Sequence, residues 1–480
     1  MHSKKDNNSK NQNFIQGLRP FSKSIPSGLK KILKKSGHNF SEIVDNWTKM
    51  VGTQISDSSY PNKIKFTKEM TNGTLILNVI HGKELEIEYQ KKEIVDKVNI
   101  HFGYNCISQV KLKIINKEKT TIEVPMKVKK QSKNFEKKLE TINMSNGVVI
   151  EAVAYELAPH IISSLSLEEE FSANLEKLGI PLGSLEMLTG IKERRFWDLG
   201  TAPSAVATLA AQKVIDQSGI NPDEIGCIIS TSVSKDYLEP SVACLVHGNL
   251  KLSAHCRNYD IGNACLGFLD GMSTIMMMLE AGQIKYGLVV AGESSRDPME
   301  PTIERLKDPN LTMDTFRDNF ATLTLGSGAV AMILTNKDNS DSGHLINGAV
   351  SLADTENNRL CIGTHEGGIT KPSELLLAGV ALATQAWKLC DTELNMSDAT
   401  VDIHVPHQVS MPHIKKLSEA LGLSIEKVFL NVQTQGNIGS AALPITLKMA
   451  EEAGRIARGD HVSLLGIGSG LNCTGMSVTW

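Results

Sequence analysis

The chain has 480 residues, of which 41% are hydrophobic, and this is enough for more than one domain with a large core. It contains no run of about 18 apolar residues, so the sequence predicts no membrane span. The N-terminus is polar and basic and lacks the apolar core of a secretory signal, which predicts a cytoplasmic protein. None of the eight cysteines forms a C-x-x-C pair, which argues against a metal site and fits a reducing compartment.

Charge is distributed unevenly along the chain, although the net charge is only −3. Residues 1–143 carry 27 Lys and Arg against 14 Asp and Glu, whereas the remaining residues carry 23 against 39. This contrast indicates two modules with different partners. The basic module could contact nucleic acid, but a solvated lysine-rich surface explains the same charge.

The basic module is expected to hold a small α+β domain of about 90 residues between two polar segments, because periodic apolar stretches mark its elements. Residues 1–25 are rich in Asn, Ser and Lys and predict a disordered basic tail. Trp47 and Val51 lie on one helical face, so we expect both to be buried. The expected elements are short helices near residues 28–35 and 39–44, strands at 73–80 and 110–115, and a helix at 84–100.

A set of spaced residues in this module is typical of one known family. They are Trp47-x-x-x-Val51-Gly52, Pro61, Gly73-Thr74-Leu75 and Asn99-x-x-x-Gly103. With them, residues 26–116 resemble the DciA-like family, bacterial proteins of KH-like fold that are linked to the replicative helicase. The resemblance implies an α+β domain that contacts the helicase or DNA. Residues 117–143 then form a lysine-rich linker.

Strands and helices alternate regularly from Met144 onward, which predicts an α/β domain with parallel strands. Two similar halves, 144–340 and 341–480, suggest an internal repeat. Met144 could also begin a complete enzyme, in which case two neighbouring genes have been read as one. The expected helices are near residues 202–217, 241–250, 265–280, 373–391, 410–421 and 438–454, and the expected strands include 227–232, 286–292, 401–405, 428–432, 462–466 and 476–480.

One cysteine stands at the start of a predicted helix. Cys265 follows a short strand in the stretch Asn263-Ala264-Cys265-Leu266-Gly267. The unpaired N–H groups and positive dipole end of a helix N-terminus favour the thiolate, which is the nucleophilic form. The alternative is a small, inert, buried cysteine.

Three further stretches could complete a catalytic site. His407 follows a predicted strand, where open α/β sheets do their chemistry, whereas His404 lies inside the strand and is expected to be structural. Asn437 stands between two glycines at a helix start, where a helix cap is the alternative. Residues 466–470 form a glycine-rich turn that offers backbone N–H groups, with a phosphate cradle as the alternative.

These residues together fit acyl transfer between thioesters. Cys265 would take an acyl group, and His407 and Asn437 would polarise the carbonyl of a second thioester. The backbone N–H groups of Cys265 and Ser469 would hold the first oxyanion. The substrates would be thioesters of coenzyme A or acyl carrier protein, and the reaction would need no cofactor or metal.

The motifs around these residues resemble those of the thiolase superfamily, in particular the β-ketoacyl-ACP synthase III type with its Cys-His-Asn triad. The resemblance covers residues 144–480 and implies a thiolase-like, five-layer αβαβα duplicated fold and a homodimer. The motifs are Asn263-Ala264-Cys265-x-Gly267-Phe268, His407-Gln408, Gly436-Asn437-Ile438-Gly439 and Gly466-x-Gly468-Ser469-Gly470.

An acidic residue helps to distinguish between two kinds of condensing enzyme. Glu239 lies at a predicted loop tip before Pro240, where an ordinary exposed acid is the alternative. With residues 407–410 and 464–472, this loop resembles OleA-like enzymes, which join two long-chain acyl-CoAs head to head without decarboxylation. Their corresponding glutamate reaches into the pocket of the partner subunit. An acyl-CoA donor must lose an α-proton, whereas a malonyl donor loses CO₂, so only the first needs a base. Glu239 is the candidate base and Asp236 the fallback.

Two other functions stay open at this point. One is a decarboxylating 3-oxoacyl-ACP synthase III of fatty-acid synthesis, and the other is a replication-associated protein that acts through its basic module. Lys192, Arg194 and Arg195 could bind the phosphates of the substrate, or form surface salt bridges. A group of methionines is expected to pack in the core, with a flexible acyl tunnel as the alternative. These are Met272, Met276, Met277 and Met278.

Overall fold

The computed structural model forms two compact units, Met1–Glu136 and Lys137–Trp480. It describes residues 43, 46–65, 72–102, 105–115, 142–341, 343–364 and 367–480. The predicted tail, the predicted helices near 28–35 and 39–44, and the linker lie outside the described residues, apart from Ile43 and the start of strand β4.

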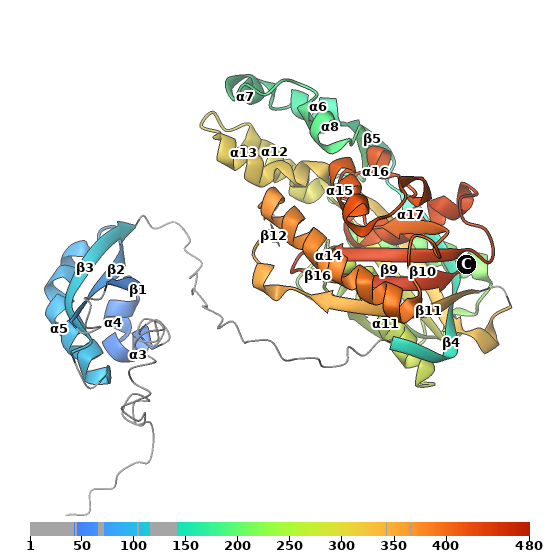
Figure 1. Cartoon of the computed structure of the whole chain (residues 1–480), viewed down its shortest axis with the longest axis horizontal. Coiled ribbons are helices and arrows are strands. Elements are labelled where there is room, and N and C mark those ends of the chain that lie inside the picture. Colours follow the sequence, from blue (N-terminus) through green and yellow to red (C-terminus); the bar gives the residue numbers. More distant parts are fainter. Residues whose placement is uncertain are drawn as a thin grey trace, which may run out of the picture. The chain divides into compact units, whose positions relative to one another are not determined.

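The first unit is a three-stranded sheet of order β1-β2-β3, with helices packed on one face (Figure 1). Strands β1 and β2 are antiparallel, whereas β2 and β3 are parallel and joined by α5. The elements are α3 (Trp47–Val51), α4 (Thr53–Ser56), β1 (Ser59–Lys65), β2 (Gly73–Ile80), α5 (Glu84–Phe102) and β3 (Ile107–Ile115). The sequence predicted β2, α5 and β3 but missed β1, because Pro61 and the polar residues after it are poor strand formers.

The core of this unit lies between α5 and the sheet. Leu75, Leu77 and Val79 alternate on the inner face of β2 and are fully buried. Trp47 and Val51 are buried with them, as expected, and the Trp47 indole nitrogen donates to the Ser59 carbonyl at 2.8 Å. Burial of each such aliphatic side chain contributes roughly 1.5–3 kcal/mol.

The second unit is built on a nine-stranded sheet of order β14-β15-β16-β11-β4-β10-β9-β7-β8. Strand β4 joins its two halves, because it pairs with β10 of one half and with β11 of the other. The strands are β4 (Ile142–Leu157), β7 (Ile225–Ser230), β8 (Arg257–Asp260), β9 (Tyr286–Glu293), β10 (Gly328–Asn336), β11 (His344–Ala353), β14 (Ile403–Pro406), β15 (His461–Gly468) and β16 (Asn472–Thr479).

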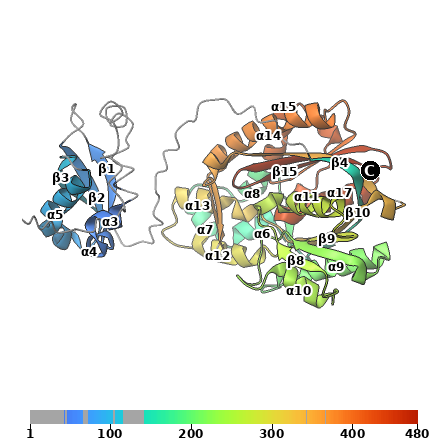
Figure 2. The same cartoon turned by 90° about the horizontal axis from the view of Figure 1, so that it is seen from below.

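Helices lie above, between and below the two halves of this sheet, which confirms the predicted thiolase-like five-layer fold (Figure 2). Helices α14 and α15 cover one half, α9 and α10 cover the other, and α11 and α17 lie between them. The two central helices are apolar on most sides because sheet packs against both their faces. The bounds are α9 (Pro203–Ser218), α10 (Val242–Asn249), α11 (Gly267–Glu280), α14 (Pro372–Leu394), α15 (Met411–Leu421) and α17 (Ala442–Glu452).

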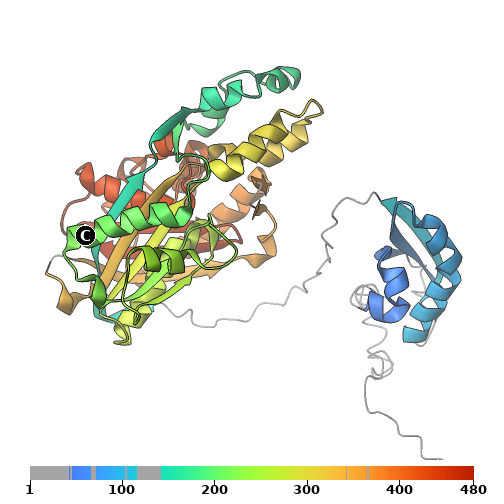
Figure 3. The same ribbon diagram turned by 180° about the vertical axis from the view of Figure 1, so that it is seen from behind.

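A group of short helices projects from one end of the layers and has its own apolar core (Figures 1 and 3). The hairpin of β12 and β13 packs against two of these helices. The elements are β5 (His160–Ser163), α6 (Ser164–Glu169), α7 (Ser172–Lys177), α8 (Ser184–Thr189), β6 (Glu193–Phe196), α12 (Arg296–Leu306), α13 (Met313–Phe320), β12 (Cys361–Thr364) and β13 (Gly367–Thr370). Within the described ranges, no helix combines the length and apolar character needed to cross a bilayer.

One predicted strand and the starts of two predicted helices differ from the structure. The strand expected at 428–432 is reduced to a single bridge between Val428 and His404, followed by α16 (Val432–Gln435). The physical reason is Gln408, whose side chain binds the Phe429 carbonyl at 2.8 Å and the Asn431 and Val432 N–H groups at 3.1 Å. These are backbone groups that a strand ladder would need. Single-turn 3₁₀ helices also precede two α-helices: η3 (Ala264–Leu266) before α11, and η8 (Gly439–Ala441) before α17.

Candidate active site

Cys265 lies in η3, in a turn that is held from two sides. Ala264 has a φ of 47°, which a residue with a side chain rarely adopts. The Asn263 amide donates to Asp270 of α11 at 2.6 Å, and its oxygen accepts from the Asn472 amide at 2.9 Å. The cysteine turn is therefore fixed between α11 and the start of β16.

The glycine-rich stretch predicted to serve this site packs directly against the cysteine turn. A Cβ at Gly468 would lie 2.8 Å from the Asn263 carbonyl, and one at Gly466 would lie 2.5 Å from the Leu266 side chain. At Gly468 the clash would be with backbone, so only glycine permits this approach of β15 to η3. An oxyanion role for the Ser469 N–H stays a prediction.

His407 follows β14 and is 2% exposed, and its backbone N–H donates to the Leu465 carbonyl at 2.8 Å. Both of its ring nitrogens are buried without a hydrogen-bond partner among the described residues. Burial lowers the pKa of His407 to about 3, with a further contribution from His413. The ring is therefore neutral near pH 7 and carries one N–H donor and one acceptor nitrogen.

Asn437 lies two residues before the start of η8 and is 8% exposed. Its side-chain oxygen accepts from the Gly439 N–H at 3.0 Å, although the N-cap position of η8 itself is Ile438. Its backbone N–H donates to the Thr324 carbonyl at 2.9 Å, and its carbonyl accepts from the Gly326 N–H at 2.9 Å. These contacts fix the orientation of the side-chain amide.

The packing of the elements brings the three predicted residues into one region. The turn η3, which carries Cys265, packs against η8, which follows Asn437, and against β15. The same strand β15 holds the backbone of His407. The separate motifs of the sequence thus meet at the ends of neighbouring strands, where α/β sheets place their sites.

A buried carboxylate that the sequence analysis missed lies close to this region. Glu293 ends β9 and is 2% exposed. Its oxygens accept from the N–H groups of Val233 at 2.9 Å, Ser234 at 3.0 Å and Ser440 at 3.3 Å, and from the Ser234 hydroxyl at 2.9 Å. No motif signalled it, because an acid at the end of an apolar strand has no distinctive spacing.

The expectation of an acidified thiol at Cys265 is wrong. Burial raises the pKa of Cys265 to about 12, and the charges of Glu293 and Cys361 raise it in the same direction. The helix N-terminus does not reverse this, because η3 separates the cysteine from α11 and removal of water disfavours the charged form. Cys265 therefore rests as a thiol.

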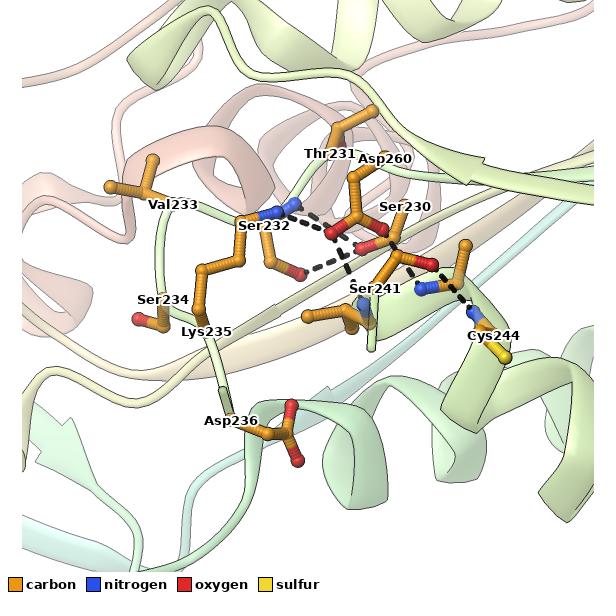
Figure 4. Close-up of polar contacts among 12 residues, drawn as sticks. Ser230, Thr231, Ser232, Val233, Ser234, Lys235, Asp236, Ser241, Cys244 and Asp260 are labelled. Carbon is orange, nitrogen blue, oxygen red and sulfur yellow. Dashed lines mark hydrogen bonds and ion pairs between the residues drawn. The ribbon is translucent and has the colours of Figure 1, made fainter. Parts of the chain in front are cut away.

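The loop that carries Glu239 is fixed near its ends (Figure 4). Lys235 forms a 2.6 Å ion pair with Asp260, which also accepts from two N–H groups at the start of α10. Asp236 points away from that pair and accepts from the N–H and hydroxyl of Ser204, so it caps α9. Glu239 itself is exposed at the tip, next to Leu238, which is 99% exposed.

The basic residues of β6 occupy different environments. Arg194 is fully buried, donates to the Leu323 carbonyl at 3.1 Å, and has its pKa lowered to about 10 by burial. A phosphate-binding role for Arg194 at the surface is therefore corrected, because its guanidinium does not reach solvent. Arg195 donates to the Ala158 carbonyl at 3.1 Å, while Lys192, just before β6, is exposed.

Apolar side chains fill the space around the site. Met272 and Met276 are fully buried in the central core, as expected, whereas Met277 is 51% exposed. A small apolar cavity next to His407 lies between α14, α15 and the sheet. Its walls include Ala383, Trp387, Cys390, Leu417 and Ile467.

Comparisons with known proteins agree with the two units. The family described as 3-oxoacyl-[acyl-carrier-protein] synthase III matches residues 259–351, and its C-terminal family matches residues 392–480. The family described as DciA, Dna[CI] antecedent, matches residues 20–112.

Two relatives are acyl-CoA:acyl-CoA alkyltransferases. The protein from Xanthomonas campestris is 40% identical over 333 residues, covering 69% of this chain and 98% of the relative. The protein from Shewanella oneidensis is 41% identical and covers 69% and 99%. A β-ketoacyl-[acyl-carrier-protein] synthase III from Natranaerobius thermophilus is 29% identical and covers 61% and 89%.

Solved structures give the same result. Cerulenin-bound OleA from Xanthomonas campestris is 40% identical, with a TM-score of 0.69 over 71% of this chain and 98% of OleA. Other OleA structures carry replacements of a cysteine, a histidine and a glutamate. In OleA these three are separated by the same numbers of residues as Cys265, His407 and Glu239 here. The chain is thus an acyltransferase of the acyl-CoA:acyl-CoA alkyltransferase (OleA) family of thiolase-like condensing enzymes, with a DciA domain in its N-terminal unit.

Proposed function

We propose that the enzyme unit condenses two long-chain acyl-CoAs head to head, without loss of CO₂, to a β-keto acid. The observation that carries this proposal is the matched separation of Glu239, Cys265 and His407 with the three residues replaced in OleA. A decarboxylating synthase III needs no counterpart of Glu239, because CO₂ loss generates its carbanion.

In the first step, the Cys265 sulfur attacks the carbonyl carbon of one acyl-CoA. Because the cysteine rests as a thiol, its proton leaves with the departing coenzyme A, so that the products are an acyl-cysteine and free coenzyme A. The neutral His407 ring can relay this proton, since it has both an acceptor and a donor nitrogen. Backbone N–H groups of Cys265 and Ser469 stabilise the oxyanion that forms.

In the second step, Glu239 removes an α-proton from the second acyl-CoA. His407 and Asn437 donate to the oxygen of its carbonyl, where negative charge then develops. The α-carbon attacks the acyl group on Cys265, the carbon–sulfur bond breaks, and the cysteine regains a proton from Glu239. Hydrolysis of the remaining thioester yields the β-keto acid. No cofactor takes part in these steps.

We place Glu239 in the active site of a partner subunit of a homodimer. The support is its position at an exposed tip, with Tyr237 61% and Leu238 99% exposed beside it. Such apolar residues on a loop anchored at its base suit burial against another chain.

The free state of all eight cysteines fits a cytoplasmic location.

The test is incubation of the purified full chain with myristoyl-CoA as the sole substrate. We expect release of free coenzyme A and formation of a long-chain ketone by decay of the β-keto acid, measured by thiol titration and mass spectrometry. If the protein condenses only malonyl thioesters, or uses acyl carrier protein alone, the synthase III function replaces this proposal.

We propose, second, that the N-terminal unit contacts DNA, with the replicative helicase as the other partner suggested by its DciA family. The specific support is the open face of its sheet. Lys63 pairs with Ile76 of β2, which in turn pairs with Lys111 of β3. Lys65 and Lys113 lie two residues further along their strands, in opposite directions because β1 runs antiparallel to β3. All four lysines are exposed, and their two strands stand about 10 Å apart, two strand spacings. Such lysines attract a phosphate backbone.

Replacement of Lys63, Lys65, Lys111 and Lys113 by glutamine is expected to weaken binding of the full chain to a single-stranded oligonucleotide by about tenfold or more at low salt. The slope of log affinity against log salt should also decrease, because fewer counterions are released. Fluorescence anisotropy measures both. The control is glutamine at Lys83 and Lys91, which pair with Glu86 and Glu88 on α5. Equal effects of both sets would exclude this face.

A further inference from the structure

Glu293 has all of its acceptor capacity occupied. One oxygen accepts from the N–H groups of Val233 and Ser440, and the other from the N–H and hydroxyl of Ser234. A carboxylate offers about four lone-pair sites, so none is left for a substrate proton. Burial raises the pKa of Glu293, but the three backbone N–H groups cannot accept a hydrogen bond from a protonated carboxyl. The site therefore holds a carboxylate that does not serve as a base.

The partners of Glu293 belong to two separate parts of the active site. Val233 and Ser234 begin the loop that leads to Glu239, whereas Ser440 lies in η8, directly after the Asn437 turn. We propose that Glu293 is a positioning residue. Its hydrogen bonds hold the loop of Glu239 against the turn that contains Asn437 and leads into η8. This inference rests on the proposed function for the role of Glu239.

Close backbone packing supports this assignment. A Cβ at Gly439 would lie 3.2 Å from the carboxyl carbon of Glu293, so glycine lets the turn reach the acid. The Ser440 hydroxyl donates to the Thr231 hydroxyl at 3.0 Å, which is a second link between the turn and the loop. A Cβ at Gly267, two residues after Cys265, would lie 3.1 Å from the Thr231 carbonyl. The loop, the turn and the cysteine are thus packed as one assembly, with Glu293 at its centre.

The charge of Glu293 has a consequence that a purely structural role would not have. Burial is the main cause of the raised pKa of Cys265, and the negative charge of Glu293 raises that pKa further. Removal of that charge at constant size should therefore lower the thiol pKa. Two substitutions separate charge from reach: Glu293→Gln keeps the length and removes the charge, and Glu293→Asp keeps the charge and shortens the arm.

The experiment compares alkylation of Cys265 by iodoacetamide with the rate of condensation. For each unit by which the thiol pKa falls, Glu293→Gln raises the thiolate fraction about tenfold and lowers its nucleophilicity about threefold, so alkylation near pH 7 should be about threefold faster. Glu293→Asp should be alkylated at the wild-type rate. Both variants should condense acyl-CoAs at least about tenfold more slowly, since misplaced catalytic groups are costly in rate.

The matched control is Glu168→Gln, because Glu168 is also 2% exposed and accepts from two backbone N–H groups, those of Gly183 and Leu185. It should lower thermal stability without changing alkylation of Cys265. Ser234→Ala removes one hydroxyl contact and provides a milder variant should the others not fold; it should slow condensation more than acylation.

The proposal would be overturned if Glu293→Gln and Glu293→Asp condensed acyl-CoAs at the wild-type rate. It would also be overturned if Cys265 were alkylated at the same rate in both variants. Alkylation of Cys265 is measured without acyl-CoA, so its result does not depend on which thioesters the enzyme condenses. If the wild type uses only malonyl donors, the condensation comparison is made with those donors, because Asn437 would serve both reactions.

Discussion

Replacement of Cys265 by alanine is expected to abolish acyl transfer and to leave the fold intact. Alanine lacks the sulfur that forms the acyl-enzyme, and its methyl group fits within η3 without new contacts. The unusual φ of this turn belongs to the neighbouring Ala264, so the substitution adds no backbone strain. Intact-mass analysis after incubation with myristoyl-CoA should show an acyl adduct on the wild type and none on the variant.

Two other cysteines serve as controls for this result. The thiol of Cys361 is close enough to influence Cys265, and Cys244 is exposed. Cys361→Ala and Cys244→Ala should both retain the adduct. An adduct that persists on Cys265→Ala but disappears from Cys361→Ala would assign the nucleophile to the hairpin cysteine instead.

Glu239→Gln is expected to reduce condensation of two acyl-CoAs by about 10²-fold or more, the usual contribution of a positioned general base. The amide keeps the size of the side chain but has no basic oxygen. Acylation of Cys265 should continue at the wild-type rate, because it requires no external carboxylate. A malonyl thioester that fits the site should restore condensation, since CO₂ loss replaces removal of the proton. Single-turnover measurements of acyl-enzyme and product separate these steps.

Asp236→Asn is the matched control, because Asp236 lies in the same loop but caps α9 through Ser204. It should lower stability by about 1 kcal/mol, since it weakens two hydrogen bonds to the first turn of α9, and leave condensation close to the wild-type rate. Condensation by Glu239→Gln at the wild-type rate would remove Glu239 as the base. A large loss in Asp236→Asn alone would transfer the role to Asp236.

Local patterns in the sequence were enough to predict most helices and strands of the layered core, but not the projecting group of short helices and hairpins. Helix α9 was expected at 202–217 from its alanine content and Pro203, and the structure has it at Pro203–Ser218. The apolar run at 286–292 became β9, and a tight turn joins β15 to β16 as expected, although β15 extends to Gly468 and the turn is limited to residues 469–471. These features succeeded because helix and strand propensity, apolar periodicity and turn residues act over a few positions.

Motifs also identified Cys265, His407 and Asn437 as candidates, because each stands at a characteristic junction between elements. The protonation states of Cys265 and His407 did not follow from those junctions. The pKa of Cys265 is raised to about 12 and that of His407 is lowered to about 3, and in both cases burial is the main cause. Desolvation depends on which distant segments cover a group, and no local pattern records that.

The packing of segments that are distant in the sequence also explains the features that only the folded chain revealed. Glu293 became part of the site because β9 ends where the loop at Val233 and the turn at Ser440 meet, three segments far apart in the sequence. Arg194 was expected near the surface but is buried against Leu323. Short-range composition determined the elements and the motif residues, whereas long-range packing determined burial, charge and the partners of each side chain.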